Sequence, residues 1–129
     1  MRRKSRLHSL IAATALAISP VSFAQQKLDI VQIMGQFVQA SYAASRCIKP
    51  DQQTLLRFLV NFKIVSIRAT DELRKRNPGY SDQQIVEHLK RGSDAVEKQI
   101  DEVIQTNGCG DPRIQDLLKR FEMQANLKF

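Results

Sequence analysis

The sequence predicts an all-α fold, a small up-down bundle of four helices closed by one disulfide. Four segments repeat apolar residues at the three- and four-residue spacing of an amphipathic helix, and no segment shows the two-residue alternation of a strand. The two cysteines, Cys47 and Cys109, lie just after the first and third of these segments. Helices one and three of an up-down bundle end at the same pole, so this topology places the two cysteines side by side.

The first predicted helix runs from about Leu28 to Arg46 and ends before Pro50, because the residue before a proline is disfavoured in helical conformation. Asp51 is the expected N-cap of the second helix, which extends to about Arg76. This second helix carries apolar residues on more than one face. We therefore expect it to be the central helix of the bundle, buried against two or three partners.

A turn signal at residues 77–80, Asn-Pro-Gly-Tyr, separates the second helix from the third. Ser81, with Gln84 three positions later, forms the capping-box pattern that opens the third helix. The apolar residues of this helix share one inner face, which Gly92 and Ser93 interrupt. We interpret the glycine as the site of a kink or of a close approach by a neighbouring helix.

Residues on both sides of the junction between the third and fourth helices indicate where one helix ends and the next begins. Gly108 suits the C-terminal end of the third helix. Asp111 is the expected N-cap of the fourth helix, and Pro112 its first residue. The inner face of this last helix is predicted to consist of Ile114, Leu117, Leu118, Phe121 and Ala125.

The first 24 residues have the order of a secretory signal peptide. A basic stretch from Arg2 to Arg6 contains no acid and precedes an apolar run, Leu10 to Val21, that is too short to span a bilayer. Cleavage after Ala24 removes 24 of the 129 residues and leaves one domain of 105 residues, 25–129. We expect a periplasmic or secreted protein with no membrane span after cleavage.

The net charge of +7 belongs mostly to the predicted signal peptide. Removing the four cations of that segment from the 20 Lys and Arg of the chain leaves 16, against 13 Asp and Glu. The mature charge is therefore +3, with the two signs interleaved along the chain. A nucleic-acid-binding domain usually has a clustered basic face, so no nucleic-acid partner is predicted.

Both cysteines remain after cleavage, and an even number of cysteines in an exported chain indicates a disulfide, here Cys47–Cys109. Zinc would need more ligands than two cysteines and His88, the single mature histidine, can supply. The C-x-x-C-H motif of covalent haem attachment is absent. We therefore predict neither a metal nor a cofactor.

No nucleophile elbow, phosphate-binding loop or H-E-x-x-H motif occurs, so no catalytic residue is assigned. The leading hypothesis is a non-catalytic exported protein that binds another protein, either as an inhibitor or immunity protein or as a stress chaperone. A homodimer stays open. The alternative is a small periplasmic enzyme that uses carboxylates alone, with Glu87–Asp94 or Asp101–Glu102 as the candidate pairs.

The candidate partner-binding site is the pole at which the second helix ends and the third begins. Arg74, Lys75 and Arg76 lie there close to the aromatic Tyr80. Arginine and tyrosine are common interface anchors, and loops on rigid scaffolds often carry recognition. A cationic helix C-terminus is also favoured by the helix dipole without any partner, so both interpretations of this cluster stay open.

Overall fold

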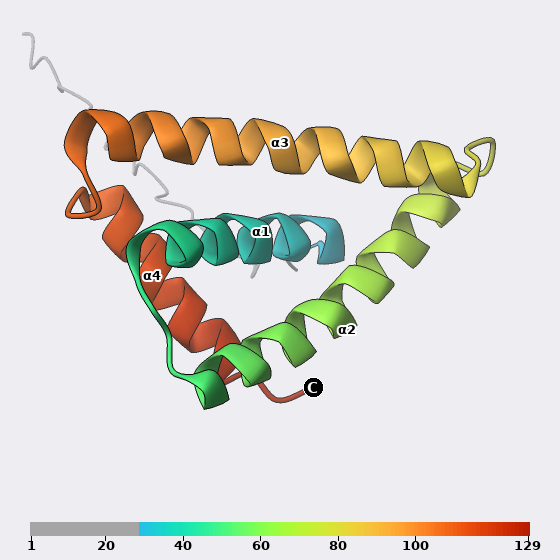
Figure 1. Cartoon of the computed structure of the whole chain (residues 1–129). Helices are drawn as coiled ribbons and strands as arrows, with labels where there is room; N and C mark the ends of the chain where they lie inside the picture. The colour runs from blue at the N-terminus through green and yellow to red at the C-terminus, as the bar shows by residue number, and fades with distance from the viewer. Residues whose placement is uncertain (1–28) are drawn as a thin grey trace, which may run out of the picture.

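Four helices make up the part of the chain that the computed structural model describes, residues 29–129 (Figure 1). They are α1 (Ile30–Cys47), α2 (Gln52–Arg76), α3 (Asp82–Asn107) and α4 (Pro112–Ala125). Because residues 29–129 contain no strand and the helices make bundle-like contacts, the predicted all-α fold class is confirmed. None of these helices combines the length and the apolar character that a membrane crossing requires. The predicted signal peptide, residues 1–24, lies outside the described residues.

Each helix begins at a residue whose side chain binds the free backbone N–H groups of the first turn. The capping residues are Asp29, Asp51, Ser81 and Asp111. Ser81 and Gln84 form both hydrogen bonds of a capping box, at 3.2 and 2.8 Å, as the sequence predicts. The cap at Asp29 makes α1 begin at Ile30, slightly later than the apolar spacing alone indicates.

Acid is expected to destabilise this fold through three of these caps. Side-chain hydrogen bonds are the main reason why the pKa values of Asp29, Asp51 and Asp111 are lowered. A lowered pKa stabilises the fold fully above the unfolded value, about 4, and that stabilisation is lost as the pH falls below it. We therefore expect the thermal midpoint, measured by circular dichroism, to fall from about pH 4 towards pH 2. In Asp111→Asn, which keeps a capping oxygen but does not titrate, the fall should be smaller.

The central helix is α1. Figure 1 shows it inside the frame that α2, α3 and α4 form, and it packs against all three. Its inner positions include Phe37 and three small residues, Ala40, Ala43 and Ala44, all of them buried. Small side chains allow neighbouring helices to approach closely on several sides, which explains why α1 can occupy the middle of the fold.

The expectation that the second helix is the central one is wrong. One face of α2 is buried, but Leu56, Val60 and Ile67 on the opposite face are 55%, 59% and 55% exposed. α2 packs against α1 and α4 and meets α3 over a short stretch only. The additional apolar residues of α2 therefore form a second stripe that the fold leaves uncovered.

The largest buried side chains of the fold are aromatic. Phe58 of α2 stacks on Phe121 of α4 with ring centroids 4.3 Å apart, and it lies 5.4 Å from Phe37 of α1. Phe62 packs beside Phe37 and Phe58 at 5.8 and 5.9 Å. Phe37, Phe58 and Phe121 are fully buried, so this cluster joins three helices from the inside.

The disulfide and one polar cluster join α1 to α3. The bond Cys47–Cys109 is present, with the two Cα atoms 5.7 Å apart, as the up-down topology predicts. Gly108, at the end of α3, has a φ of +75°, a left-handed conformation that glycine adopts without strain and that turns the chain towards Cys109. Farther along, the Tyr42 hydroxyl donates to Asp101 at 2.8 Å.

Gly92 neither interrupts α3 nor marks a close helix approach. The helix runs unbroken from Asp82 to Asn107. An apolar groove of about 220 Å³ separates the first half of α3 from α1, with Gly35 and Gly92 among the residues that line it. A Cβ atom on either glycine would meet no other atom within 4 Å. The predicted close approach is therefore wrong, because the two helices are held apart here.

Candidate functional site

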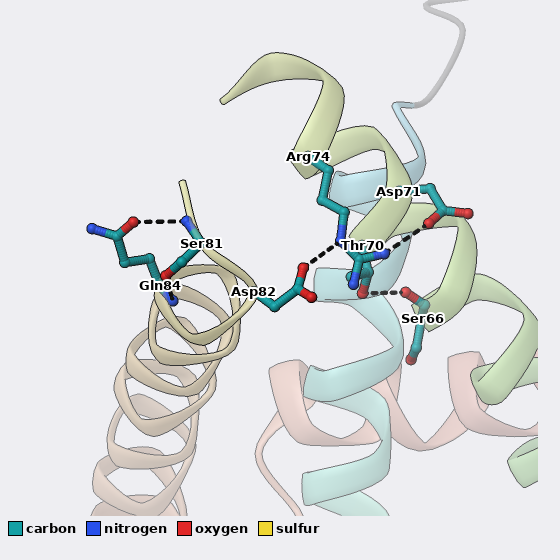
Figure 2. Close-up of polar contacts among 7 residues, drawn as sticks. All are labelled: Ser66, Thr70, Asp71, Arg74, Ser81, Asp82 and Gln84. Atoms are coloured by element: carbon teal, nitrogen blue, oxygen red, sulfur yellow. Dashed lines mark hydrogen bonds and ion pairs between the residues drawn. The ribbon is translucent and has the colours of Figure 1, made fainter. Parts of the chain in front are cut away.

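The cationic pole predicted from the sequence lies at the junction of α2 and α3. The guanidinium of Arg74 lies between two carboxylates, 3.2 Å from Asp71 and 3.0 Å from Asp82, so it links the end of α2 to the first residue of α3 (Figure 2). The nearby capping box of Ser81 and Gln84 fixes the entry into α3. Arg74 therefore has a structural role within the protein itself.

Arg76 has internal partners as well. Its two terminal nitrogens donate to both oxygens of Asp29, at 2.7 and 2.8 Å, and its Nε donates to Glu72 at 2.9 Å. This bidentate pair holds the start of α1 against the end of α2. The other two predicted site residues, Lys75 and Tyr80, are exposed as well, and Lys75 forms no ion pair within residues 29–129. Partner binding at this pole stays a prediction.

The candidate carboxylates of the enzyme alternative all belong to α3. Asp94 forms an ion pair with Lys90 at 2.8 Å, and Asp101 is bound by Arg46 at 3.0 Å and by the Tyr42 hydroxyl. The hydrogen bond from Tyr42 to Asp101 also raises the pKa of Tyr42. Asp94 and Asp101 therefore have partners that neutralise or orient them, and they serve as contacts between or along helices.

A surface that the sequence analysis did not identify lies on the outside of α2. It consists of the most exposed apolar side chains of α2 together with those of the C-terminal segment, residues 126–129, and we call it the α2 outer face. Its members are Leu56, Leu59, Val60, Ile67, Leu127 and Phe129. The α2 members lie on the side away from the buried positions Phe58 and Val65, where the exposed Lys63 stands between Val60 and Ile67.

The C-terminal segment forms one wall of a groove beside this stripe. Asn61, a buried residue of α2, donates from its side-chain nitrogen to the carbonyl oxygens of Gln124 and Leu127, at 2.8 and 2.9 Å. Farther along, the guanidinium of Arg68 lies over the Phe129 ring, 5.5 Å from its centroid. These contacts hold the segment along α2 and leave a groove of about 340 Å³, lined by α2 and residues 125–128.

Most charges around the α2 outer face are positive, and the one acid recorded beside its apolar residues, Asp71 next to Ile67, is paired with Arg74. Arg57, Lys63 and Arg68 are the only charged residues of α2 between Gln52 and Thr70, and Lys128 follows on the C-terminal segment. None of these four cations forms an ion pair within residues 29–129. The surface is thus an apolar stripe with a groove at its side, cations without ion pairs along the groove and at Lys63, and the Asp71–Arg74 ion pair at its far end.

This surface had a detectable signal in the sequence, namely apolar residues on two opposite faces of one helix. A contiguous exposed apolar patch on a small domain is a typical mark of an interaction site. Comparisons with descriptions of known protein families, with curated protein sequences and with solved structures find no match to this chain.

Proposed function

We propose that this chain is an exported, non-catalytic protein that acts by binding another protein, and that the α2 outer face is the surface that binds. The observation that carries this proposal is the second apolar stripe of α2, in which Leu56, Val60 and Ile67 are each more than half exposed. Core packing does not need these side chains, and their exposure to water costs free energy that a partner would recover on binding.

The disulfide supports the exported location. A bond between Cys47 and Cys109 forms and persists in an oxidising compartment such as the periplasm or the extracellular space. The proposal of a periplasmic protein adds the predicted signal peptide of residues 1–24 to this observation.

Capture of the partner from a periplasmic extract tests this proposal when two matched variants are compared. Val60→Glu places a charge in the middle of the α2 outer face. Val86→Glu makes the same change on α3, at a side chain that is equally exposed. We expect Val60→Glu to weaken binding by more than about 30-fold, because burying a carboxylate in the middle of an apolar contact costs more than about 2 kcal/mol. We expect Val86→Glu to bind normally, and both variants to keep the thermal midpoint of the parent.

Equal capture by both variants would contradict the assignment of the α2 outer face as the binding surface. The exposed residues Lys75 and Tyr80 would then be the next site to test. The pH of the capture separates the two roles that the sequence leaves open. An inhibitor or immunity protein binds its partner as a folded domain at neutral pH. A stress chaperone binds only where acid has weakened the caps and loosened the fold.

A further inference from the structure

We infer that the occupant of the α2 outer face is an amphipathic helix of another protein that carries acidic side chains beside its apolar stripe. This inference rests on the proposed function and specifies the partner of the same surface. It follows from three properties of the surface: the spacing of its apolar residues, the groove beside them and the sign of the surrounding charge.

The spacing matches a helix. Leu56, Val60 and Ile67 lie four and seven residues apart, and Lys63 occupies the position between Val60 and Ile67, so the four follow the four-three-four spacing of a seam between two packed helices, with one lysine in it. From Leu56 to Ile67 this seam is about 16 Å long at 1.5 Å per residue, or roughly three helical turns. A partner helix of similar length can lay its own apolar residues along it.

The groove adjoins one end of the seam. Leu56 and Val60 form its α2 side, and Leu127 and Lys128 form the opposite wall. Its volume of about 340 Å³ accommodates large side chains projecting from a partner helix. A recess of this kind favours a protein partner over the headgroups of a lipid surface, because a protein side chain can fill it.

The positive charge of the α2 outer face indicates that the partner carries acidic side chains. One cation, Lys63, lies within the seam, and Arg57, Arg68 and Lys128 lie along its groove side. Carboxylates on the partner would meet these groups along the groove side and opposite Lys63. A second copy of this chain would instead bring the same cations face to face, which disfavours a homodimer through this surface.

Two labelled synthetic helical peptides test the inference on the mature, disulfide-bonded protein by fluorescence anisotropy. Both have leucines at alternating three- and four-residue spacing over 18 residues. One has glutamates on its flanks, and the other has lysines at the same positions. We expect the glutamate peptide to bind saturably and the lysine peptide to bind at least about tenfold more weakly. Raising the salt concentration should reduce this difference.

Two charge-reversed variants provide the matched comparison. Lys63→Glu/Lys128→Glu reverses two cations of the α2 outer face that have no ion pairs in residues 29–129. Arg91→Glu/Lys98→Glu makes the same change of net charge on α3. We expect the first variant to lose the preference for the glutamate peptide and the second to keep it.

Several results would overturn the inference. These are failure of the glutamate peptide to bind, equal binding of the two peptides, competition by phosphatidylglycerol vesicles, and a dimer in sedimentation that Val60→Glu dissociates. The proposed function has a separate readout. If a captured protein is lost with Val60→Glu but is unaffected by Lys63→Glu/Lys128→Glu, protein binding stands and the acidic helix does not.

Discussion

Replacing both cysteines with serine, in Cys47→Ser/Cys109→Ser, is expected to lower the free energy of unfolding by roughly 4 kcal/mol. The bond joins residues 62 positions apart, so its removal releases a long loop in the unfolded chain. For a domain of this size the thermal midpoint should fall by roughly 15–30 °C, which thermal unfolding followed by circular dichroism would measure.

Reduction of the parent protein provides the control for that experiment. A reducing agent should lower the thermal midpoint of the parent to that of the double-serine variant and leave the variant itself unchanged. A parent midpoint that does not respond to complete reduction would show that the bond contributes little, and that helix packing alone accounts for the stability.

Truncation of Phe58 is the second change with a large expected effect. Phe58→Ala removes a fully buried ring that contacts Phe37, Phe62 and Phe121, and it leaves a cavity at the meeting point of α1, α2 and α4. We expect a loss of about 3–5 kcal/mol in the free energy of unfolding, measured by urea denaturation.

Phe129→Ala is the matched control, because Phe129 is largely exposed and its ring contacts the Arg68 guanidinium at the surface. We expect it to cost less than about 1 kcal/mol. Equal losses in the two variants would mean that the aromatic cluster does not form the core in solution.

The helix boundaries could be predicted because they depend on local chemistry, and the disulfide because it depends on the order of the helices. A capping side chain such as Asp51 or Ser81 acts within one turn of its own helix, so the residues that decide the boundary are adjacent in sequence. The pairing of Cys47 with Cys109 needed only the order and direction of the helices.

The burial of α2 could not be predicted in the same way. Apolar residues on two faces indicate either a helix buried on both sides or a helix with one face left for a partner, and the pattern is the same in both cases. The burial of α2 depends on which helix occupies the centre of the fold. In this fold α1 occupies the centre, and its small residues Ala40, Ala43 and Ala44 are buried there. An alanine face has a weaker apolar signal in the sequence than a face of leucine and phenylalanine.

The candidate site was missed for a related reason. Leu127 and Phe129 follow the last predicted helix and belong to no periodic segment, so the sequence gives them no place in the fold. Their position depends on Asn61, a polar residue 66 positions before Leu127 whose hydrogen bonds hold the C-terminal segment against α2. A contact between residues so far apart has no local signal.

The groove between α1 and the first half of α3 has a consequence for the cooperativity of unfolding. Beyond Gly92, α3 is held to α1 by Asp101 and by the disulfide that follows the helix. Before Gly92 its one fully buried side chain is Ile85, and the glycine itself costs about 1 kcal/mol of helix stability relative to alanine. We therefore expect residues 82–91 to open locally while α1, α2 and α4 stay folded, so that amide hydrogen exchange there reports a lower free energy than in the aromatic core.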